Sequence, residues 1–146
     1  MKKVILTIVS AVVLLAVCFC VSVPVVNDMY AKRVADELGA LPLPENTRVA
    51  EKMSAAAKLW GNGNGMQYMG ALLIESALPL EELEKFYSES ACRVSRQNGK
   101  AVTVTEHGNY RFDTDIDSDN YYIVYALGSG DGAFRRLYAE LDPRGY

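Results

Sequence analysis

The sequence predicts an α+β protein, in which an amino-terminal transmembrane helix is followed by a largely antiparallel sheet with one packed helix. Three observations predict this class. Residues 4–26 carry no charged side chain, one later segment has helical periodicity, and several short segments alternate or are rich in β-branched and aromatic residues. Because most of these short segments follow one another without a helix between them, their sheet should be mostly antiparallel.

The apolar run at residues 4–26 is expected to cross a membrane as a helix. Its only polar side chains are those of Thr7, Ser10 and Ser22. At about 1.5 Å per residue the run spans roughly 34 Å, enough for a hydrocarbon core of about 30 Å. Residues 1–26 are therefore predicted to be an uncleaved signal anchor that crosses the membrane once.

Two other interpretations of this segment stay open. A cleaved signal peptide has a shorter apolar core that ends in a small-x-small site, whereas the candidate sites here end on Val17, Val21 or Val23. A lipoprotein would use Leu15-Ala16-Val17-Cys18, where Val17 stands at the position at which the bacterial lipobox has Gly, Ala or Ser. Valine is a poor residue for either kind of processing.

Charge predicts the orientation of the chain and limits its partners. Lys2 and Lys3 precede the apolar run, so the short amino-terminal end is expected in the cytoplasm and the domain outside the cytoplasmic membrane. From Asn27 onward, 13 basic residues face 18 acidic ones, a balance of −5. This stretch has no Lys/Arg cluster that could follow a phosphate backbone. Other envelope proteins are therefore better partner candidates than nucleic acid.

Residues 27–44 are expected to join the membrane segment to the domain. Apolar residues recur at helical spacing up to Leu38, and Gly39 suits a helix C-cap, so a juxtamembrane helix should continue the anchor. The segment Leu41-Pro42-Leu43-Pro44 excludes helix and predicts a short extended linker. The extracytoplasmic α+β domain is therefore placed at residues 45–146.

Two strands and a helix are predicted at the start of this domain. Residues 48–54 alternate, and residues 66–75 are apolar on both faces, which is typical of a central strand with a layer over each face. Pro79 suits the first turn of a helix. One apolar stripe of that helix should lie on the sheet, formed by Leu80, Leu83, Phe86 and Tyr87.

Four more strands are predicted after this helix, at residues 101–106, 110–113, 121–127 and 134–141. The first alternates valine with threonine, and the third is dense in aromatic and β-branched residues. The last strand would place Leu137, Ala139 and Leu141 on one face. The resulting order is β-β-α-β-β-β-β.

The run Gly61, Asn62, Gly63, Asn64 and Gly65 is predicted to be a tight turn, with a ligand-binding loop as the alternative. Its spacing is not G-x-G-x-x-G, and no Lys-Ser/Thr pair follows it as a P-loop requires. Asn-Gly steps supply the positive φ angles of tight turns. The run therefore fits a turn better than a phosphate site.

Asp113, Asp115, Asp117 and Asp119 alternate along an acidic segment, as the first ligands of a calcium loop do. An EF-hand loop also needs Gly at position 6 and Glu at position 12. Counting from Asp113 or from Asp115 supplies neither residue. An exposed acidic turn is predicted, with a weak surface calcium site as the alternative, and no other metal or cofactor is expected.

The sequence carries no recognisable catalytic motif. His107 is the only histidine, and it falls in a predicted hairpin turn without a nucleophile motif beside it. Cys92 is the only cysteine outside the apolar run, so this part of the chain cannot close an internal disulfide. An acid pair would need the sheet to bring together carboxylates at predicted strand ends, namely Glu75, Glu106 and Glu140.

Three segments resemble a set of small membrane-anchored bacterial proteins that share a short exported α+β domain. These segments are Leu41-Pro-Leu-Pro-Glu-Asn-Thr47, Gly61-Asn-Gly-Asn-Gly-Met-Gln-Tyr68 and Leu80-Glu-Glu-Leu-Glu-Lys-Phe-Tyr87, with weaker support from Arg144-Gly145. No activity is established for these proteins. The resemblance therefore implies location and fold, and it assigns no functional residue.

Three functions compete at this point. The first is a non-enzymatic interaction or binding domain held at the outer face of the cytoplasmic membrane, with an unknown ligand. The second is a pilin-like assembly subunit, which shares the layout of an apolar helix leading into an α+β head, although residues 4–26 contain no Glu and no pilin processing site. The third is a lipoprotein-type envelope enzyme that uses the strand-end carboxylates.

Overall fold

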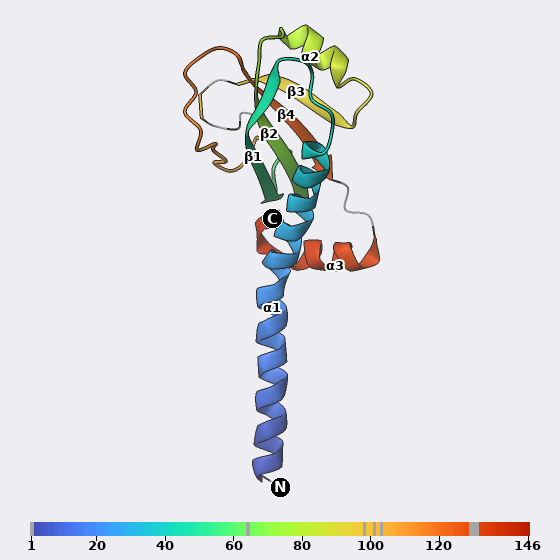
Figure 1. Ribbon diagram of the computed structural model, residues 1–146. Coiled ribbons are helices and arrows are strands. Elements are labelled where there is room, and N and C mark those ends of the chain that lie inside the picture. The colour runs from blue at the N-terminus through green and yellow to red at the C-terminus, as the bar shows by residue number, and fades with distance from the viewer. Residues whose placement is uncertain (1, 64, 98, 101, 103, 129–131) are drawn as a thin grey trace.

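The computed structural model describes residues 2–63, 65–97, 99–100, 102, 104–128 and 132–146. A long helix carries a head that contains the sheet (Figure 1), and the predicted α+β class is confirmed. The elements follow the order α1 (Lys2–Gly39), β1 (Thr47–Ala57), β2 (Gln67–Ser76), α2 (Leu80–Phe86), β3 (Cys92–Arg96), β4 (Tyr121–Gly128), α3 (Ala133–Leu141) and the 3-10 turn η1 (Pro143–Gly145).

The four strands form one sheet in the order β1-β2-β4-β3, and every neighbouring pair is antiparallel. β2 and β4 are central, and β1 and β3 form the edges. The register of the central pair runs from Tyr68 opposite Gly128 to Glu75 opposite Tyr121. The prediction that residues 66–75 lie in the middle of a sheet is therefore correct.

Both faces of the sheet are covered, as the apolar pattern of β2 predicts. Leu72 and Ile74 face one side of the sheet, where they pack in one cluster with residues of α1 and α2 that include Leu38. The predicted apolar stripe of α2 lies on this face through Leu83. Met69, Ala71 and Leu73 share the other face with a set of residues from the connecting segments, which includes Leu59, Val102 and Phe112.

α1 is a single helix with two environments. Large apolar side chains up to Val21 are exposed, whereas Ala31, Ala35 and Leu38 are buried against the sheet. The helix is assigned without a break through Pro24. The juxtamembrane helix that was expected to continue the anchor is therefore the carboxy-terminal part of α1, and it packs within the head.

The prediction of a strand at residues 134–141 is wrong, because these residues lie in α3. Leu137, Ala139 and Leu141 have the spacing of one strand face. The same segment also places apolar residues at positions i, i+3, i+4 and i+7, the period of an amphipathic helix. These residues are Phe134, Leu137, Tyr138 and Leu141.

The described residues of the predicted strands at 101–106 and 110–113 do not form extended strands, although Arg111 forms a β-bridge and two hydrogen bonds join the two segments. Val102 N–H donates to the Tyr110 carbonyl at 2.9 Å, and Phe112 N–H donates to the Lys100 carbonyl at 2.7 Å. The described residues of this segment otherwise form turns and loop, and Ala101 and Thr103 lie outside the described residues. Thr-rich alternation predicts a strand, but this segment serves as a cover for the sheet.

β3 was not predicted, and β1 is longer than predicted. β3 pairs with β4 over its full length, from Cys92 opposite Ala126 to Arg96 opposite Tyr122. β1 continues through Ala57 even though its alanines favour helix, because each pairs with β2. Pairing in the sheet outweighs the local helix propensity here.

Candidate functional site

α1 crosses the sheet in direct contact with the backbone of β2. A Cβ atom at Gly70 would lie 2.5 Å from the Cα and N atoms of Ala35, so only glycine allows the helix this close. On β4, a Cβ at Gly128 would lie 2.5 Å from Cγ2 of Val34. Glycine inside a strand often marks such an approach of another backbone. The helix and the sheet are therefore fitted to each other through small residues.

A polar junction, formed by Asn27, Asp28, Tyr68, Asp142 and Arg144, joins α1 to the carboxy terminus; Asn27, Tyr68 and Asp142 are buried, and Asp28 and Arg144 lie at its exposed side. Asn27 is fully buried in α1. Its amide nitrogen donates to Oδ2 of Asp142 at 2.9 Å and to the carbonyl of Tyr138 at 3.0 Å. Its amide oxygen accepts from the Tyr68 hydroxyl at 2.7 Å. One side chain thus bridges α1, β2, α3 and the turn that follows α3.

Arg144 completes the junction from the 3-10 turn. Its Nε donates to Oδ1 of Asp142 at 3.0 Å, and its Nη2 donates to Oδ2 at 2.8 Å. The fork geometry of guanidinium suits such a pair of parallel bonds to a carboxylate. Arg144 also reaches α1, where it donates to Oδ1 of Asp28 at 2.8 Å and to the carbonyl of Pro24 at 3.1 Å.

The charges of this junction are fixed by their partners. Burial opposes ionisation of Asp142, but the hydrogen bonds from Arg144 and Asn27 outweigh it and hold its pKa below the ordinary value. The bond to Asp142 raises the pKa of Arg144 further above its ordinary value, and Asp28 adds to this. Both groups are therefore charged at neutral pH. Both carboxylate oxygens of Asp142 accept hydrogen bonds within the chain, so the junction holds α1 and the 3-10 turn together.

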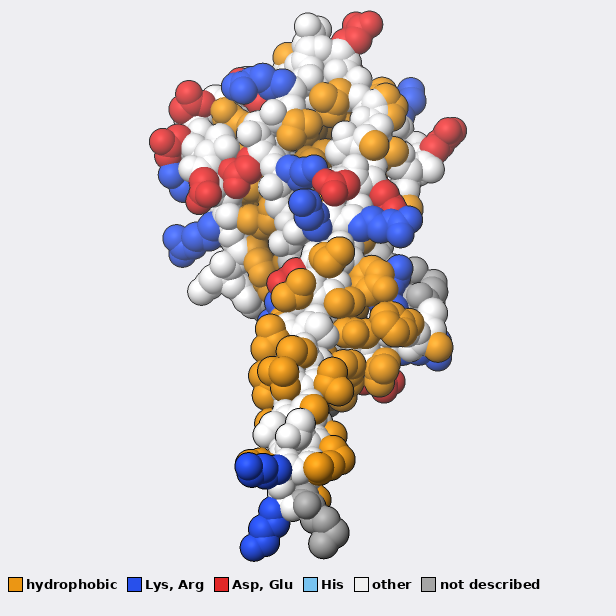
Figure 2. All heavy atoms as spheres, turned by 60° about the horizontal axis from the view of Figure 1, so that its bottom comes forward, with side chains coloured by type: hydrophobic (Ala, Val, Ile, Leu, Met, Phe, Trp, Pro, Cys, Tyr) orange, Lys and Arg blue, Asp and Glu red, His pale blue; other side chains and the backbone are white. Residues whose placement is uncertain are grey.

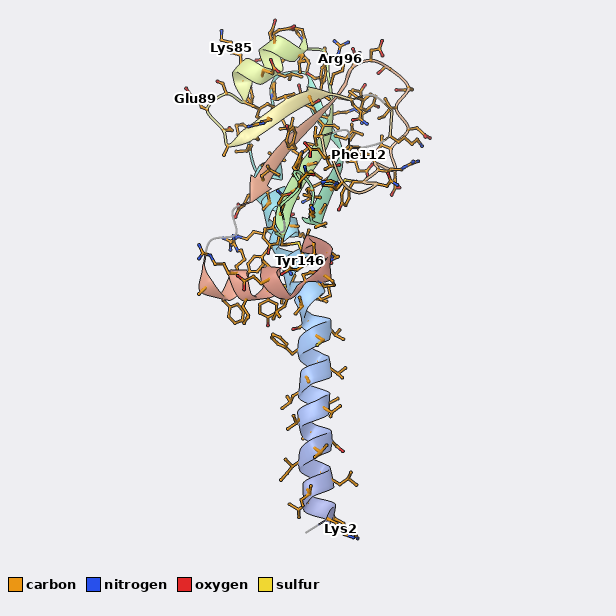
Figure 3. All side chains as sticks on the ribbon, turned by 180° about the vertical axis from the view of Figure 1, so that it is seen from behind. Lys2, Lys85, Glu89, Arg96, Phe112 and Tyr146 are labelled. Carbon is orange, nitrogen blue, oxygen red and sulfur yellow. The ribbon has the colours of Figure 1, made fainter. Side chains whose placement is uncertain are left out.

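α3 lies across α1 at the base of the head (Figure 1). Tyr138 is its buried residue, and the Tyr138 ring lies 5.7 Å from the ring of Phe19 and 5.0 Å from that of Phe134, between centroids. Arg135 lies over the Tyr30 ring at 4.4 Å, a cation–π contact. Tyr146 closes the chain beside α3 and α1 (Figure 3), where its hydroxyl donates to the Glu140 carbonyl at 2.6 Å.

The other face of α3 is apolar and exposed. Its large apolar side chains Phe134, Leu137 and Leu141 are 65%, 45% and 49% exposed. Seen from below, the apolar side chains of α1 and α3 run together into one surface (Figure 2). This end of the head, where the polar junction adjoins an uncovered apolar surface, is one of two candidate functional surfaces; the other is a groove beside α1.

The glycine–asparagine run connects β1 and β2, and its described residues are held by the chain itself. Gly61 and Gly65 have positive φ angles of 74° and 151°, as the turn prediction requires. Gly61 N–H donates to a carboxylate oxygen of Glu106 at 2.8 Å, and Gly65 N–H donates to the Gly145 carbonyl at 2.7 Å. The Glu106 carboxylate thus already accepts from the backbone N–H of Gly61, a donor that a bound anion would need. Asn64 lies outside the described residues.

The acidic segment is tied to β1 and to Lys100. Glu51 accepts from the Thr114 N–H at 2.8 Å. Burial opposes ionisation of Glu51, but its bonds to the backbone at Thr114 and Asp113 hold its pKa below the ordinary value. Asp115 pairs with Lys100, which lowers the pKa of Asp115. In the described part of the chain, no three His, Cys, Asp or Glu side chains gather into a group that could hold a metal ion.

The three carboxylates that were predicted at strand ends lie on separate segments: Glu75 on β2, Glu106 between β3 and β4, and Glu140 on α3. Glu75 pairs with Arg48 across β1 and β2. Glu106 bonds Gly61, as described above, and Glu140 is exposed on α3. His107 also lies beside the glycine–asparagine run, and its Nε2 is 2.9 Å from the Gly61 carbonyl oxygen. Each of the first two carboxylates thus has a partner in the loops and strands around it, which suits structural roles.

A groove beside α1 contains the one cysteine of the head. It has a volume of about 410 Å³. Its apolar lining comes from α1, the segment after it and the β3–β4 edge, and includes Val34, Leu38, Leu41, Cys92, Ala126 and Leu127. Burial raises the pKa of the Cys92 thiol, so the thiol stays protonated at neutral pH. A protonated thiol is a poor nucleophile, and the groove is better suited to an apolar side chain than to catalysis.

Comparison of the chain with protein-family models, with curated proteins and with solved structures finds no match. The resemblance of residues 41–87 to small anchored bacterial proteins therefore stays a prediction. Function has to be argued from the chain's own residues.

Sequence reasoning did not find the polar junction. Asn27 follows the apolar run directly, and Asp142 and Arg144 lie in a carboxy-terminal segment without a motif. The usable signals were Gly70 inside a strongly apolar strand and Asn27 at helical spacing with Ala31 and Ala35. Two partners of Asn27, Tyr138 and Asp142, lie more than 100 positions away along the chain, and the third, Tyr68, lies 41 positions away. No local pattern indicates such contacts.

Proposed function

We propose that this chain is a single-pass membrane protein whose α+β head lies outside the cytoplasmic membrane and binds a partner protein of the envelope, without enzymatic activity. The observation that supports this proposal best is the division of α1. Its amino-terminal part exposes large apolar side chains on all sides, and its carboxy-terminal part is built into the head (Figure 3).

The exposed part of α1 fits a bilayer in length and composition. It is long and apolar enough to cross a membrane, and its most apolar window has no buried residue. From Lys3 to Val23, a helix rises about 30 Å, the thickness of a hydrocarbon core. So large an apolar surface is unfavourable in water, and lipid removes that cost.

The head would then be held at a fixed height and a fixed rotation relative to α1. Ala31, Ala35 and Leu38 are buried in it, and the polar junction ties α1 to the carboxy terminus. The segment at residues 41–44 connects α1 to β1 within the head, so no flexible linker separates the head from the apolar run. A rigid connection of this kind between α1 and the head suits a domain that presents one surface to a neighbouring membrane protein.

The groove beside α1 is the best candidate for the binding surface. It combines an apolar lining with Cys92, the first residue of the edge strand β3, and the exposed Leu127 of β4 is among its lining residues. Exposed apolar surface next to an unpaired strand edge is typical of peptide or protein recognition. An apolar side chain of the partner would fill the groove.

Two measurements test the proposal. In cells with a permeabilised outer envelope, protease should digest the head, and the intact protein should keep the mass of its whole amino terminus. A lower mass would indicate cleavage and an acyl-sized increase would indicate a lipoprotein, and a protected head would contradict the orientation.

The binding surface is tested by photo-crosslinking in intact cells. A photoreactive residue in place of Leu127 should give one discrete adduct with another protein. The matched control is Val49, an exposed apolar residue on the edge strand β1, which does not line the groove. Equal adducts from both positions, or none from Leu127, would contradict binding at this groove.

A pilin-like assembly subunit remains the second candidate, because one observation favours it. The carboxy-terminal part of α1 packs on a four-stranded antiparallel sheet while the amino-terminal part is free, which is the layout expected of such a subunit. In that case the amino terminus would be processed and the crosslinks would join copies of this chain through residues 4–21.

A further inference from the structure

α3 is a short helix with a sharply divided surface. On a helical wheel Phe134, Leu137 and Leu141 fall within a narrow arc together with Tyr138. Arg136 and Glu140 lie on the opposite side and are exposed. The arc is a continuous apolar stripe, and apart from Tyr138 it is uncovered.

The height of α3 along α1 is fixed by two contacts. The Tyr138 ring touches Phe19, and the Tyr138 carbonyl accepts from Asn27. A hydrocarbon core of about 30 Å that begins at Lys3 ends near Val23, midway between these two contacts. α3 therefore lies at the level where the acyl chains meet the headgroups.

The direction of the stripe agrees with this height. The apolar surfaces of α1 and α3 are continuous when the molecule is viewed from the end that carries Lys2 (Figure 2). α3 lies across α1 rather than along it (Figure 1). The exposed charged residues Arg136 and Glu140 lie on the side of the helical wheel opposite the stripe.

We propose that α3 is an interfacial helix, which lies in the plane of the bilayer that α1 spans and places Phe134, Leu137 and Leu141 among the lipids. This inference rests on the proposed membrane anchoring. Helices of this kind bury their apolar face about 5–10 Å into the boundary between headgroups and acyl chains. Phe134, Leu137 and Leu141 are also of the residue types that such helices carry on their apolar face.

The second contact with the membrane gives the head a defined tilt. Transmembrane helices are tilted by about 20° on average from the bilayer normal, and a single helix alone does not fix the direction of that tilt. α3 extends sideways from α1 and is tied to it through Asn27 and Asp142. With both helices in lipid, the groove beside α1 is held at one height and one tilt relative to the membrane surface.

Tryptophan quenching by brominated phospholipids tests this placement in the full-length protein. Trp60 is the only tryptophan, so Trp60→Phe gives a dark background into which one reporter is placed. Phe134→Trp and Leu137→Trp report on the apolar stripe, Arg136→Trp reports on the opposite face of α3, and Val13→Trp reports on α1. The proteins are compared in phosphatidylcholine vesicles with bromine near the headgroup or deep in the acyl chain.

We expect quenching at the two stripe positions to be several-fold stronger than at Arg136→Trp, and strongest with the shallow bromine. Val13→Trp should respond most to the deep bromine. If Val13→Trp is quenched and the stripe positions are not, α1 is in the membrane and the inference for α3 is overturned. If Val13→Trp is not quenched, the proposed anchoring itself fails.

A second copy of the chain is the competing occupant of the stripe. It would shield Phe134→Trp from brominated lipid, and Phe134→Cys would then form disulfide-linked dimers in the same vesicles. Quenching at Phe134→Trp that does not change when the protein is diluted in lipid supports the bilayer as the occupant. Dimers with an unquenched stripe overturn it.

Discussion

At the scale of residues, the molecule depends on a few positions where chemistry or size permits no substitute. Asn27 uses both halves of its amide, and Asp142 uses both of its oxygens. Gly70 leaves room for a backbone. Buried polar groups are costly to leave unpaired, so removing one partner of such a set costs more than the bond itself contributes.

Asp142→Asn tests the polar junction. The substitution keeps the shape of the side chain and removes the charge that Arg144 and Asn27 bind, so it should lower the free energy of unfolding of the head by about 2 kcal/mol. Denaturant titration of the full-length protein in micelles at neutral pH measures this change. The control is Asp115→Asn, whose carboxylate is exposed and paired with Lys100; a change as large as that of Asp142→Asn would contradict the account.

The pH dependence of stability should carry the signature of the same carboxyl. The pKa of Asp142 in the folded protein lies below its ordinary value of 3.8, so its ionised form favours folding. Its contribution is complete above the ordinary pKa and is lost as pH falls through the lower, folded-state value. The stability difference between wild type and Asp142→Asn should therefore be constant near neutral pH and shrink below about pH 4. A difference that grows on acidification would show the opposite sign of the shift.

Gly70→Ala tests the close approach of α1 to β2. The added Cβ would collide with backbone atoms of Ala35, which cannot move without displacing the helix. We expect a loss of about 1–3 kcal/mol in the unfolding free energy, with greater exposure of α1 to proteolysis near Ala35. Gly63→Ala is the matched control, because an added Cβ there has nothing within 4 Å, and its stability should stay close to wild type.

Tyr87→Phe should cost little. The hydroxyl of Tyr87 is buried, and it has no hydrogen-bond partner among the described residues, while its ring packs between α2 and the sheet. Removing a buried group that lacks a partner is neutral or stabilising, by up to about 1 kcal/mol. Thermal unfolding of the two proteins side by side measures the difference. A clear loss of stability would mean that the hydroxyl is bonded in solution.

At the scale of elements, the sequence predicted what is periodic and strongly apolar. The membrane-length helix, the two-faced central strand β2, the helix after Pro79 and the aromatic strand β4 are all present. Each carries its own pattern, and the burial of each face agrees with that pattern. Local propensity and tertiary packing point the same way in these four elements.

The elements that were missed or wrongly predicted are those in which a strand period and a helical period coexist, or in which contacts between distant segments decide the secondary structure. Residues 134–141 satisfy both a strand spacing and a helical one, and the helical face wins because Tyr138 packs on α1. β3 has only five residues and exists through its pairing with β4. β1 keeps its strand through three alanines because β2 pairs with them. A single sequence does not reveal these partners.

The candidate site was the least predictable part. The glycine run and the acidic segment attracted attention as motifs, and their described residues bond mainly to other parts of the chain. The junction at Asn27, Asp142 and Arg144 and the exposed face of α3 have no sequence motif. They arise because α1, β2 and the carboxy terminus meet, which only the folded chain shows.

At the scale of the whole molecule, α1 is both the proposed anchor and a structural element of the head. Its exposed part would be stable in lipid, and its buried part is held by small residues and by the polar junction. Motion of the anchor would therefore be transmitted to the sheet without an intervening linker. The same arrangement places α3 and the carboxy terminus at the base of the head.

The most direct test of this rigid connection between the proposed anchor and the head is one distance measured by pulsed electron paramagnetic resonance in lipid nanodiscs. Spin labels at Val13→Cys and Glu37→Cys, in a background without Cys18, Cys20 and Cys92, lie on the two parts of α1. An unbroken helix predicts a single narrow distribution near 36 Å between the backbone positions, with the label at position 13 accessible to lipid-soluble oxygen. A broad or much shorter distribution, or a label at position 13 that is exposed to water, would contradict the account.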